Sequence, residues 1–155
     1  MREKPKHEMR VWAILCHISA LLGWLLLFFL VFAGIPLYLP INIFAPLLVW
    51  RFKKAQYPWI NLQGKESLNF QISLSFYTLI VIILSLVLVV TSCGVAVTSN
   101  STVNEIKTTL DGLLVMFMSL ILLVMLLQSF LVTFAAIKAY KGEHYRYPLT
   151  IRVLR

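Results

Sequence analysis

The sequence predicts an all-α integral membrane protein, a four-helix transmembrane bundle whose short second helix is broken by proline. Three observations lead to this prediction. Sixty per cent of the 155 residues are hydrophobic and only 13% are charged, about half the charged share of an ordinary soluble domain. The charges fall in short blocks between long uncharged stretches. Each uncharged stretch holds at least the ~20 residues with which a helix crosses the hydrocarbon layer.

The composition also excludes several classes of protein. A soluble domain of this size cannot bury so many apolar side chains, so a soluble enzyme is excluded, as is a disordered chain. The length fits one membrane domain over residues 1–155. The net charge of +8 comes without a folded basic domain, so nucleic acid is not an expected partner. Basic residues beside the spans instead predict contacts with membrane lipids, including anionic headgroups.

The first two spans lie in the uncharged stretch 11–50, which is too long for one helix. We expect a first span over about residues 10–32, a turn at 33–39 and a short helix over 40–52. At 1.5 Å per residue the short helix is only ~20 Å long, so it spans fully only with help from the extended residues before it. A re-entrant hairpin over 34–50 is the alternative. The residues that break the stretch are Gly34, Pro36, Pro40 and Pro46.

The remaining spans are expected over residues 68–90 and 113–137, each long enough for one crossing. Residues 51–66 are expected to form a basic loop, and the charged residues between 105 and 111 a polar loop. A basic cytoplasmic tail, 138–155, follows the last span. Aromatic side chains near these boundaries predict an interfacial belt: Trp12, Trp50, Trp59, Tyr57, Tyr140, Tyr145 and Tyr147.

The distribution of Lys and Arg predicts the orientation, because short cytoplasmic loops are enriched in both residues. With four crossings, the N-terminus, residues 51–66 and the tail share one side, and of the 14 Lys and Arg residues only Lys107 lies opposite. With three crossings, the basic loop would move outside. We therefore expect a multi-pass protein of the inner (plasma) membrane with both termini in the cytoplasm.

Uncharged polar residues inside the spans predict a polar layer in the cytoplasmic leaflet. The start of the third span is polar on two sides, so other helices are expected to cover it. Interhelical hydrogen bonds, worth ~0.6 kcal/mol each, are the favoured interpretation, and a small binding cavity is the alternative. The residues expected in this layer are His17, Ser19, Asn69, Gln71, Ser75 and Thr133.

Candidate chemistry is sparse. His17 is a weak candidate ligand for a tetrapyrrole, but no second intramembrane histidine accompanies it. We find no catalytic motif and too few ligands for a metal site, so we expect no enzyme activity, cofactor or metal. Charged residues near the inner end of the third and fourth spans predict a cytoplasmic cap in which a glutamate pairs with a basic residue: Lys65, Glu66, Glu143 and Arg146.

Several segments, in order, resemble a known family. They are WAILCHISALLG at 12–23, PLLVW at 46–50 with Lys53 and Lys54, GKESLNFQIS at 64–73, and AAIKA at 135–139 with GEHYRYPLTIR at 142–152. The chain resembles the bacterial MamF-like small membrane proteins of unknown function, and it is similar to the four-helix subunit of the chloroplast inner-envelope import translocon. The resemblance implies four helices, no known enzyme activity and an organising role in membranes.

Two functions remain open from the sequence. The first is a non-enzymatic accessory, assembly or organising subunit of a larger membrane complex, whose partners are other membrane subunits or copies of itself. The alternative is a component of a transporter or channel that uses the polar layer and the broken second helix. The magnetosome relatives are associated with crystal maturation, but the chain has nothing acidic that would bind an iron mineral, so this role is not transferred.

Overall fold

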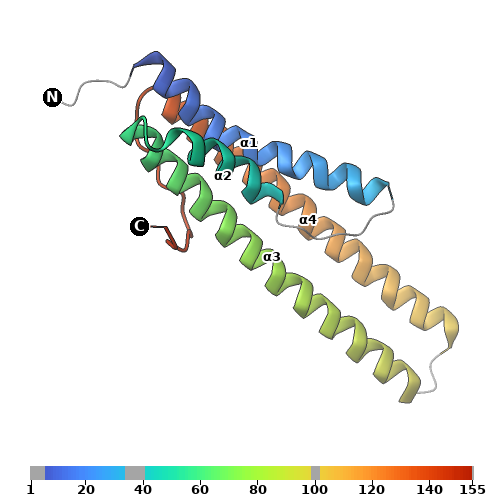
Figure 1. Ribbon diagram of the computed structural model, residues 1–155. Helices are drawn as coiled ribbons and strands as arrows, with labels where there is room; N and C mark the ends of the chain where they lie inside the picture. The colour runs from blue at the N-terminus through green and yellow to red at the C-terminus, as the bar shows by residue number, and fades with distance from the viewer. Residues whose placement is uncertain (1–5, 34–40, 99–101, 155) are drawn as a thin grey trace. The chain divides into compact units, whose positions relative to one another are not determined.

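The computed structural model describes residues 6–33, 41–98 and 102–154 (Figure 1). Over these residues the chain forms four α-helices and no strand, so the predicted all-α fold with four helices is confirmed. The predicted turn at 33–39 lies, apart from Ala33, outside the described residues. The helices are α1 (His7–Phe32), α2 (Ile41–Lys53), α3 (Pro58–Thr98) and α4 (Val103–Tyr140).

The basic loop expected over residues 51–66 is wrong, because most of this segment is helical. α2 continues to Lys53, a turn occupies residues 54–57, and α3 begins at Pro58. Proline suits the first position of a helix, since its φ angle already fits and its missing N–H is not needed there. The charged Lys65 and Glu66 therefore lie within α3 and not in a loop.

The polar loop expected between 105 and 111 is also helical, since α4 begins at Val103. Thr102 and Glu105 form a capping box at its start. The Thr102 N–H donates to Glu105 Oε2 over 2.8 Å, and the Glu105 N–H donates to Thr102 Oγ1 over 3.4 Å. This reciprocal pair satisfies backbone donors that have no partner inside the helix, which explains why α4 starts among polar residues.

Three helices in the described parts of the chain are long and apolar enough to cross a membrane, in α1, α3 and α4. They expose large apolar side chains such as Leu22, Leu84 and Leu123, as expected where lipid is the surrounding solvent. α2 has 13 residues, a length of ~20 Å. A full crossing by α2 therefore stays a prediction, as does the re-entrant alternative.

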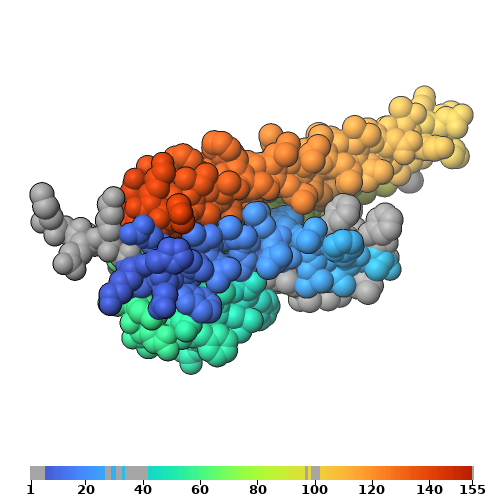
Figure 2. Space-filling view, turned by 90° about the horizontal axis from the view of Figure 1, so that it is seen from above, coloured from blue at the N-terminus to red at the C-terminus, as the bar shows by residue number. Residues whose placement is uncertain are grey.

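The chain divides into two compact units, and α3 and α4 contribute to both. Unit 1 comprises residues 1–75 and 129–155, and unit 2 comprises residues 76–128. In unit 1, α1 lies beside α2 and the last turns of α4 (Figure 2). On each of α1 and α4, fully buried residues recur at spacings of three and four, so they share one face of the helix. Most of these side chains are small, which lets neighbouring helix backbones approach closely. The fully buried members are Ala13, Cys16 and Ala20 on α1 and Val132, Ala135 and Ala139 on α4.

A close contact between Trp50 of α2 and Gly64 of α3 fixes the two helices against each other. A Cβ atom added to Gly64 would lie 2.4 Å from Trp50 Cδ1, so only glycine fits there. The indole Nε1 of Trp50 donates to Asn61 Oδ1 over 3.0 Å, and Lys54 Nζ lies 4.1 Å from the centre of the indole ring. Lys53 makes a similar cation–π contact with Trp12 of α1 at 4.5 Å.

Unit 2 is a hairpin of the second half of α3 and the first part of α4. The less exposed residues of each helix recur at spacings of three and four, so they form one seam on each helix. On α3 the seam carries small side chains, and on α4 it carries large ones. The seam residues near the hairpin end are Ser85, Val89, Ser92 and Ala96 on α3 and Ile106, Leu110, Leu113 and Phe117 on α4.

Candidate functional site

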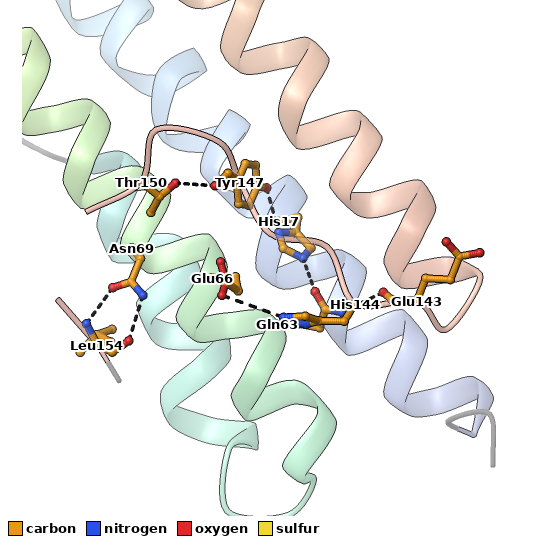
Figure 3. Close-up of polar contacts among 9 residues, drawn as sticks. All are labelled: His17, Gln63, Glu66, Asn69, Glu143, His144, Tyr147, Thr150 and Leu154. Atoms are coloured by element: carbon orange, nitrogen blue, oxygen red, sulfur yellow. Dashed lines mark hydrogen bonds and ion pairs between the residues drawn. The ribbon is translucent and has the colours of Figure 1, made fainter. Parts of the chain in front are cut away.

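The candidate site is a buried polar network in unit 1, where α1, α2, α3 and the C-terminal tail meet (Figure 3). α3 supplies five of its nine side chains, and four of these come from the segment that the sequence predicted to be polar on two sides. Burying so many amides and hydroxyls is costly unless each is hydrogen-bonded. Its buried members are His17, Ser19, Asn42, Gln63, Ser67, Asn69, Gln71, Ser73 and Tyr147.

His17 of α1 lies at the centre of one hydrogen-bonded chain. Its Nε2 is 3.1 Å from Gln63 Oε1 and its Nδ1 is 2.9 Å from the Tyr147 hydroxyl. Since an amide oxygen only accepts, the neutral imidazole carries its hydrogen on Nε2 and accepts from Tyr147 at Nδ1. The Gln63 amide in turn donates to the carbonyl of Glu143 over 3.1 Å. The chain therefore joins α1, α3 and the tail through neutral groups.

A second group of bonds connects α2 to α3. Asn42 Nδ2 donates to Gln71 Oε1 over 2.9 Å and lies 3.4 Å from Ser75 Oγ. Asn42 is one turn before Pro46, which has no N–H for the Asn42 carbonyl. The Asn42 side chain bonds to α3, so it stabilises the contact between the two helices.

A third group of bonds captures the backbone of the tail. Asn69 Oδ1 accepts the N–H groups of Val153 and Leu154 over 3.1 and 2.8 Å, and Asn69 Nδ2 donates to the Leu154 carbonyl over 2.9 Å. Ser73 Oγ accepts the N–H of Ile151 over 2.8 Å. Two side chains of α3 thus supply the hydrogen bonds that a neighbouring strand would supply in a sheet.

Aromatic rings hold the tail between α3 and α4. Tyr147 stacks on Phe70 of α3 with ring centres 4.1 Å apart and planes 9° apart. Tyr145 meets Tyr147 edge to face at 5.2 Å and Phe134 of α4 at 5.3 Å. Tyr147 was expected in an interfacial belt, but it is only 5% exposed. A tyrosine hydroxyl is protonated at neutral pH, so this one is able to donate.

The structure places most of the predicted polar layer in this network. His17, Ser19, Asn69 and Gln71 are buried and Ser75 is half-buried, whereas Thr133 is exposed on α4. Ser19 Oγ bonds only within α1, to the Cys16 carbonyl over 3.4 Å. The sequence interpretation missed Gln63, which it assigned to a loop. If residues 58–67 had been interpreted as a helix, Gln63 would have been placed one turn before Ser67 and on the same face. Ser67 belongs to the network, since its hydroxyl donates to the Cys16 carbonyl over 2.7 Å.

Two residues of the predicted cytoplasmic cap, Glu66 and Glu143, have described ionic contacts, and the cap itself stays a prediction. Glu143 pairs with Lys138 at 2.6 Å, and Glu66 Oε1 is 4.0 Å from His144 Nε2. Arg146 is exposed, while Lys65 is half-buried. The tail does contact the start of α3, but the contacts of Gln63, Phe70 and Asn69 described above are uncharged.

The chemistry available to this network is hydrogen bonding between helices. Both ring nitrogens of His17 are engaged, so ligation of a tetrapyrrole would first have to break one bond. Over the described residues, no group of three or more His, Cys, Asp and Glu side chains is placed to hold a metal ion.

Comparison with known proteins places the chain in a family. No curated protein and no solved structure matches it, and the similarity to the chloroplast translocon subunit stays a prediction. The model of the magnetosome magnetite crystal formation protein family matches residues 8–154. This match includes all four helices and the tail up to Leu154. The chain therefore belongs to the MamF/MmsF family of magnetosome magnetite crystal formation proteins.

Proposed function

We propose that the protein is a non-enzymatic accessory or organising subunit of a larger membrane complex and contributes in this way to magnetosome formation. The observation that carries the proposal is the use of the buried polar groups. Gln63 and His17 join three segments, Asn42 joins α2 to Gln71, and Asn69 holds the tail. These contacts support a scaffold that presents a fixed outer surface to partners.

The acidic residues support an indirect part in crystal formation. The chain has six Asp and Glu residues in all. Glu143 is paired with Lys138, and Glu66 faces His144. In the part of the chain that the structure describes, the acidic side chains form no group of three or more that could hold metal ions. We therefore propose that the protein acts on crystal formation through other membrane subunits or copies of itself.

The proposed setting is the inner membrane or a membrane derived from it, with both termini in the cytoplasm. The basic residues that support this orientation flank the helices on one side, where they also attract anionic headgroups. Lys53 and Lys54 are held at the end of α2 by the rings of Trp12 and Trp50. Membrane lipid is therefore part of the proposed surroundings of the scaffold.

Recovery of partners from the native membrane tests the proposal. The tagged protein is extracted in mild detergent, and co-purifying proteins are quantified by mass spectrometry. We expect a stoichiometric membrane partner. The Asn69→Ala/Tyr147→Phe variant loses four hydrogen bonds that hold the tail, so it should recover less of the partner. The Asn104→Ala/Tyr140→Phe variant, at exposed positions, should recover the normal amount. Elution of the intact protein alone would overturn the proposal.

The transporter alternative is tested separately. Its support was the polar layer and the broken second helix, but Asn42 of that helix and Gln71 of the layer bond to each other in the structure, so we do not adopt it. Solute or ion flux through liposomes that hold the purified protein, abolished by Asn42→Leu, would reverse this choice.

A further inference from the structure

The path of the tail along α3 is the starting point. The carbonyl of Glu143 bonds to Gln63, Tyr147 stacks on Phe70, and the N–H of Ile151 bonds to Ser73. Leu154 then bonds to Asn69, one turn back. From Gln63 to Ser73 the axis of α3 advances ~15 Å. The tail therefore runs along α3 away from its first residue and then turns back.

The depth of the turning point follows from the charges of α3. Lys65 and Glu66 are the last charged residues before an uncharged stretch that continues to residue 104. Ser73 lies seven positions beyond Glu66, a distance of ~10 Å along the helix. If the hydrocarbon layer begins just beyond Glu66, the tail reaches well into a leaflet of ~15 Å.

Five backbone groups between Ile151 and Leu154 are bonded to protein groups, as a lipid environment requires. Asn69 bonds to the N–H and the carbonyl of Leu154, and Ser73 accepts the N–H of Ile151. The Ile151 carbonyl also accepts the Val153 N–H over 3.2 Å. Irregular backbone persists at membrane depth only where the protein supplies such partners, whereas in water these groups would need none.

The outward side chains are apolar at alternate positions. Leu149, Ile151 and Val153 are 87%, 45% and 58% exposed. Leu149 follows Pro148 and has a φ angle of 54°, a left-handed conformation that occurs in tight turns, and its side chain projects outward. Arg152 lies between the apolar positions, and its long side chain can extend back to the headgroups.

We propose that residues 147–154 form a re-entrant segment in the leaflet at the start of α3, with Leu149, Ile151 and Val153 in contact with lipid acyl chains. The segment acts as an anchor that closes the inner end of the bundle against lipid. The basic tail is then only partly cytoplasmic. This inference is independent of the proposed accessory function, because it concerns where the tail lies and not what the protein binds.

Site-directed fluorescence in liposomes tests the depth of the tail. Single cysteines replace Leu149, Ile151 or Lys141 in a Cys93→Ser background, and a Leu22→Cys variant marks a lipid-facing position. The native Cys16 is buried, and the Cys93→Ser parent checks that it stays unlabelled. Each cysteine carries a bimane, which is quenched from the lipid by brominated acyl chains and from water by iodide.

We expect the labels at 149 and 151 to be quenched by brominated lipid as the label at 22 is. Iodide should quench the labels at 149 and 151 at least about fivefold less than it quenches the label at 141, because hydrocarbon excludes ions. Labels at 149 and 151 that behave like the label at 141 would overturn the proposal and leave an exposed peptide for a protein partner.

A second variant separates docking from labelling effects. Asn69→Ala removes three hydrogen bonds to the tail, so the label at 151 should become accessible to iodide. Asn104→Ala, an exposed asparagine on α4, is the matched control and should change nothing. Unchanged protection of the label at 151 in Asn69→Ala would contradict the proposed docking.

Discussion

Tyr147 and His17 are 130 positions apart, and the tyrosine hydroxyl lies 2.9 Å from Nδ1 of the imidazole. This contact joins the C-terminal tail to the first helix. Because Gln63 holds the other ring nitrogen, the imidazole is fixed in one tautomer with its acceptor toward Tyr147. The tail is therefore a structural part of unit 1.

Tyr147→Phe should loosen the tail without removing its aromatic packing. The ring can still stack on Phe70, but His17 loses its donor, and a buried acceptor without a partner costs about 1–3 kcal/mol. We expect a lower thermal midpoint in detergent and faster trypsin cleavage after Arg146 and Arg152. Tyr140→Phe, at an exposed position, is the control. Equal cleavage rates in the two variants would show that the hydroxyl does not hold the tail.

Gly64→Ala should separate α2 from α3, because the new methyl group would overlap the Trp50 ring. Overpacking of this kind costs about 1–3 kcal/mol. Gly112→Ala is the matched control, since nothing lies within 4 Å of the added Cβ and alanine favours a helix by up to ~1 kcal/mol over glycine. Thermal unfolding followed by tryptophan fluorescence measures both. The contact is disproved if the two substitutions shift the midpoint in the same direction.

Gly142→Ala should disturb the exit of the tail from α4. Gly142 has a φ angle of 77°, and it closes α4 with bonds from Gly142 N to the Ala139 carbonyl and from Glu143 N to the Lys138 carbonyl. This is the Schellman arrangement, and a side chain in this conformation costs roughly 1–2 kcal/mol.

The expected result for Gly142→Ala is a lower thermal midpoint, with Gly142→Asn less affected because asparagine tolerates positive φ better. Gly94→Ala, a helical glycine with open space around its Cβ, controls for the loss of glycine itself. A Gly142→Ala protein as stable as the Asn variant would argue against the strained exit.

Asn42 and Gln71 should show a measurable coupling. Their bond of 2.9 Å is the main polar contact described between α2 and α3 in the apolar part of unit 1, and such bonds in membrane bundles average ~0.6 kcal/mol with a maximum near 1.7. A double-mutant cycle with Asn42→Leu and Gln71→Leu, measured by unfolding in mixed micelles, gives the coupling free energy between the two side chains. Additive effects of the two substitutions would indicate that the side chains do not interact in the membrane.

The sequence predicted the helices correctly wherever the composition of a single segment decides whether a helix forms. Long uncharged stretches predict helices in α1, α3 and α4, and prolines separate a short α2, since these properties need no knowledge of neighbours. It was wrong at 51–66 and 105–111, where charge suggested loops. Pro58 and the Thr102–Glu105 capping box start the helices there, and both signals were present in the sequence.

The polar layer shows what sequence alone determined and what required the tertiary structure. The position of His17, Asn69 and Gln71 along their helices was enough to predict their burial, because polar groups amid apolar stretches need covered partners. Their partners were decided only by the fold. Gln63 bonds to His17 from 46 positions away, and Asn69 bonds to Leu154 from 85. Such pairings depend on how the tail folds back along α3, and that path is set by contacts that no local pattern encodes.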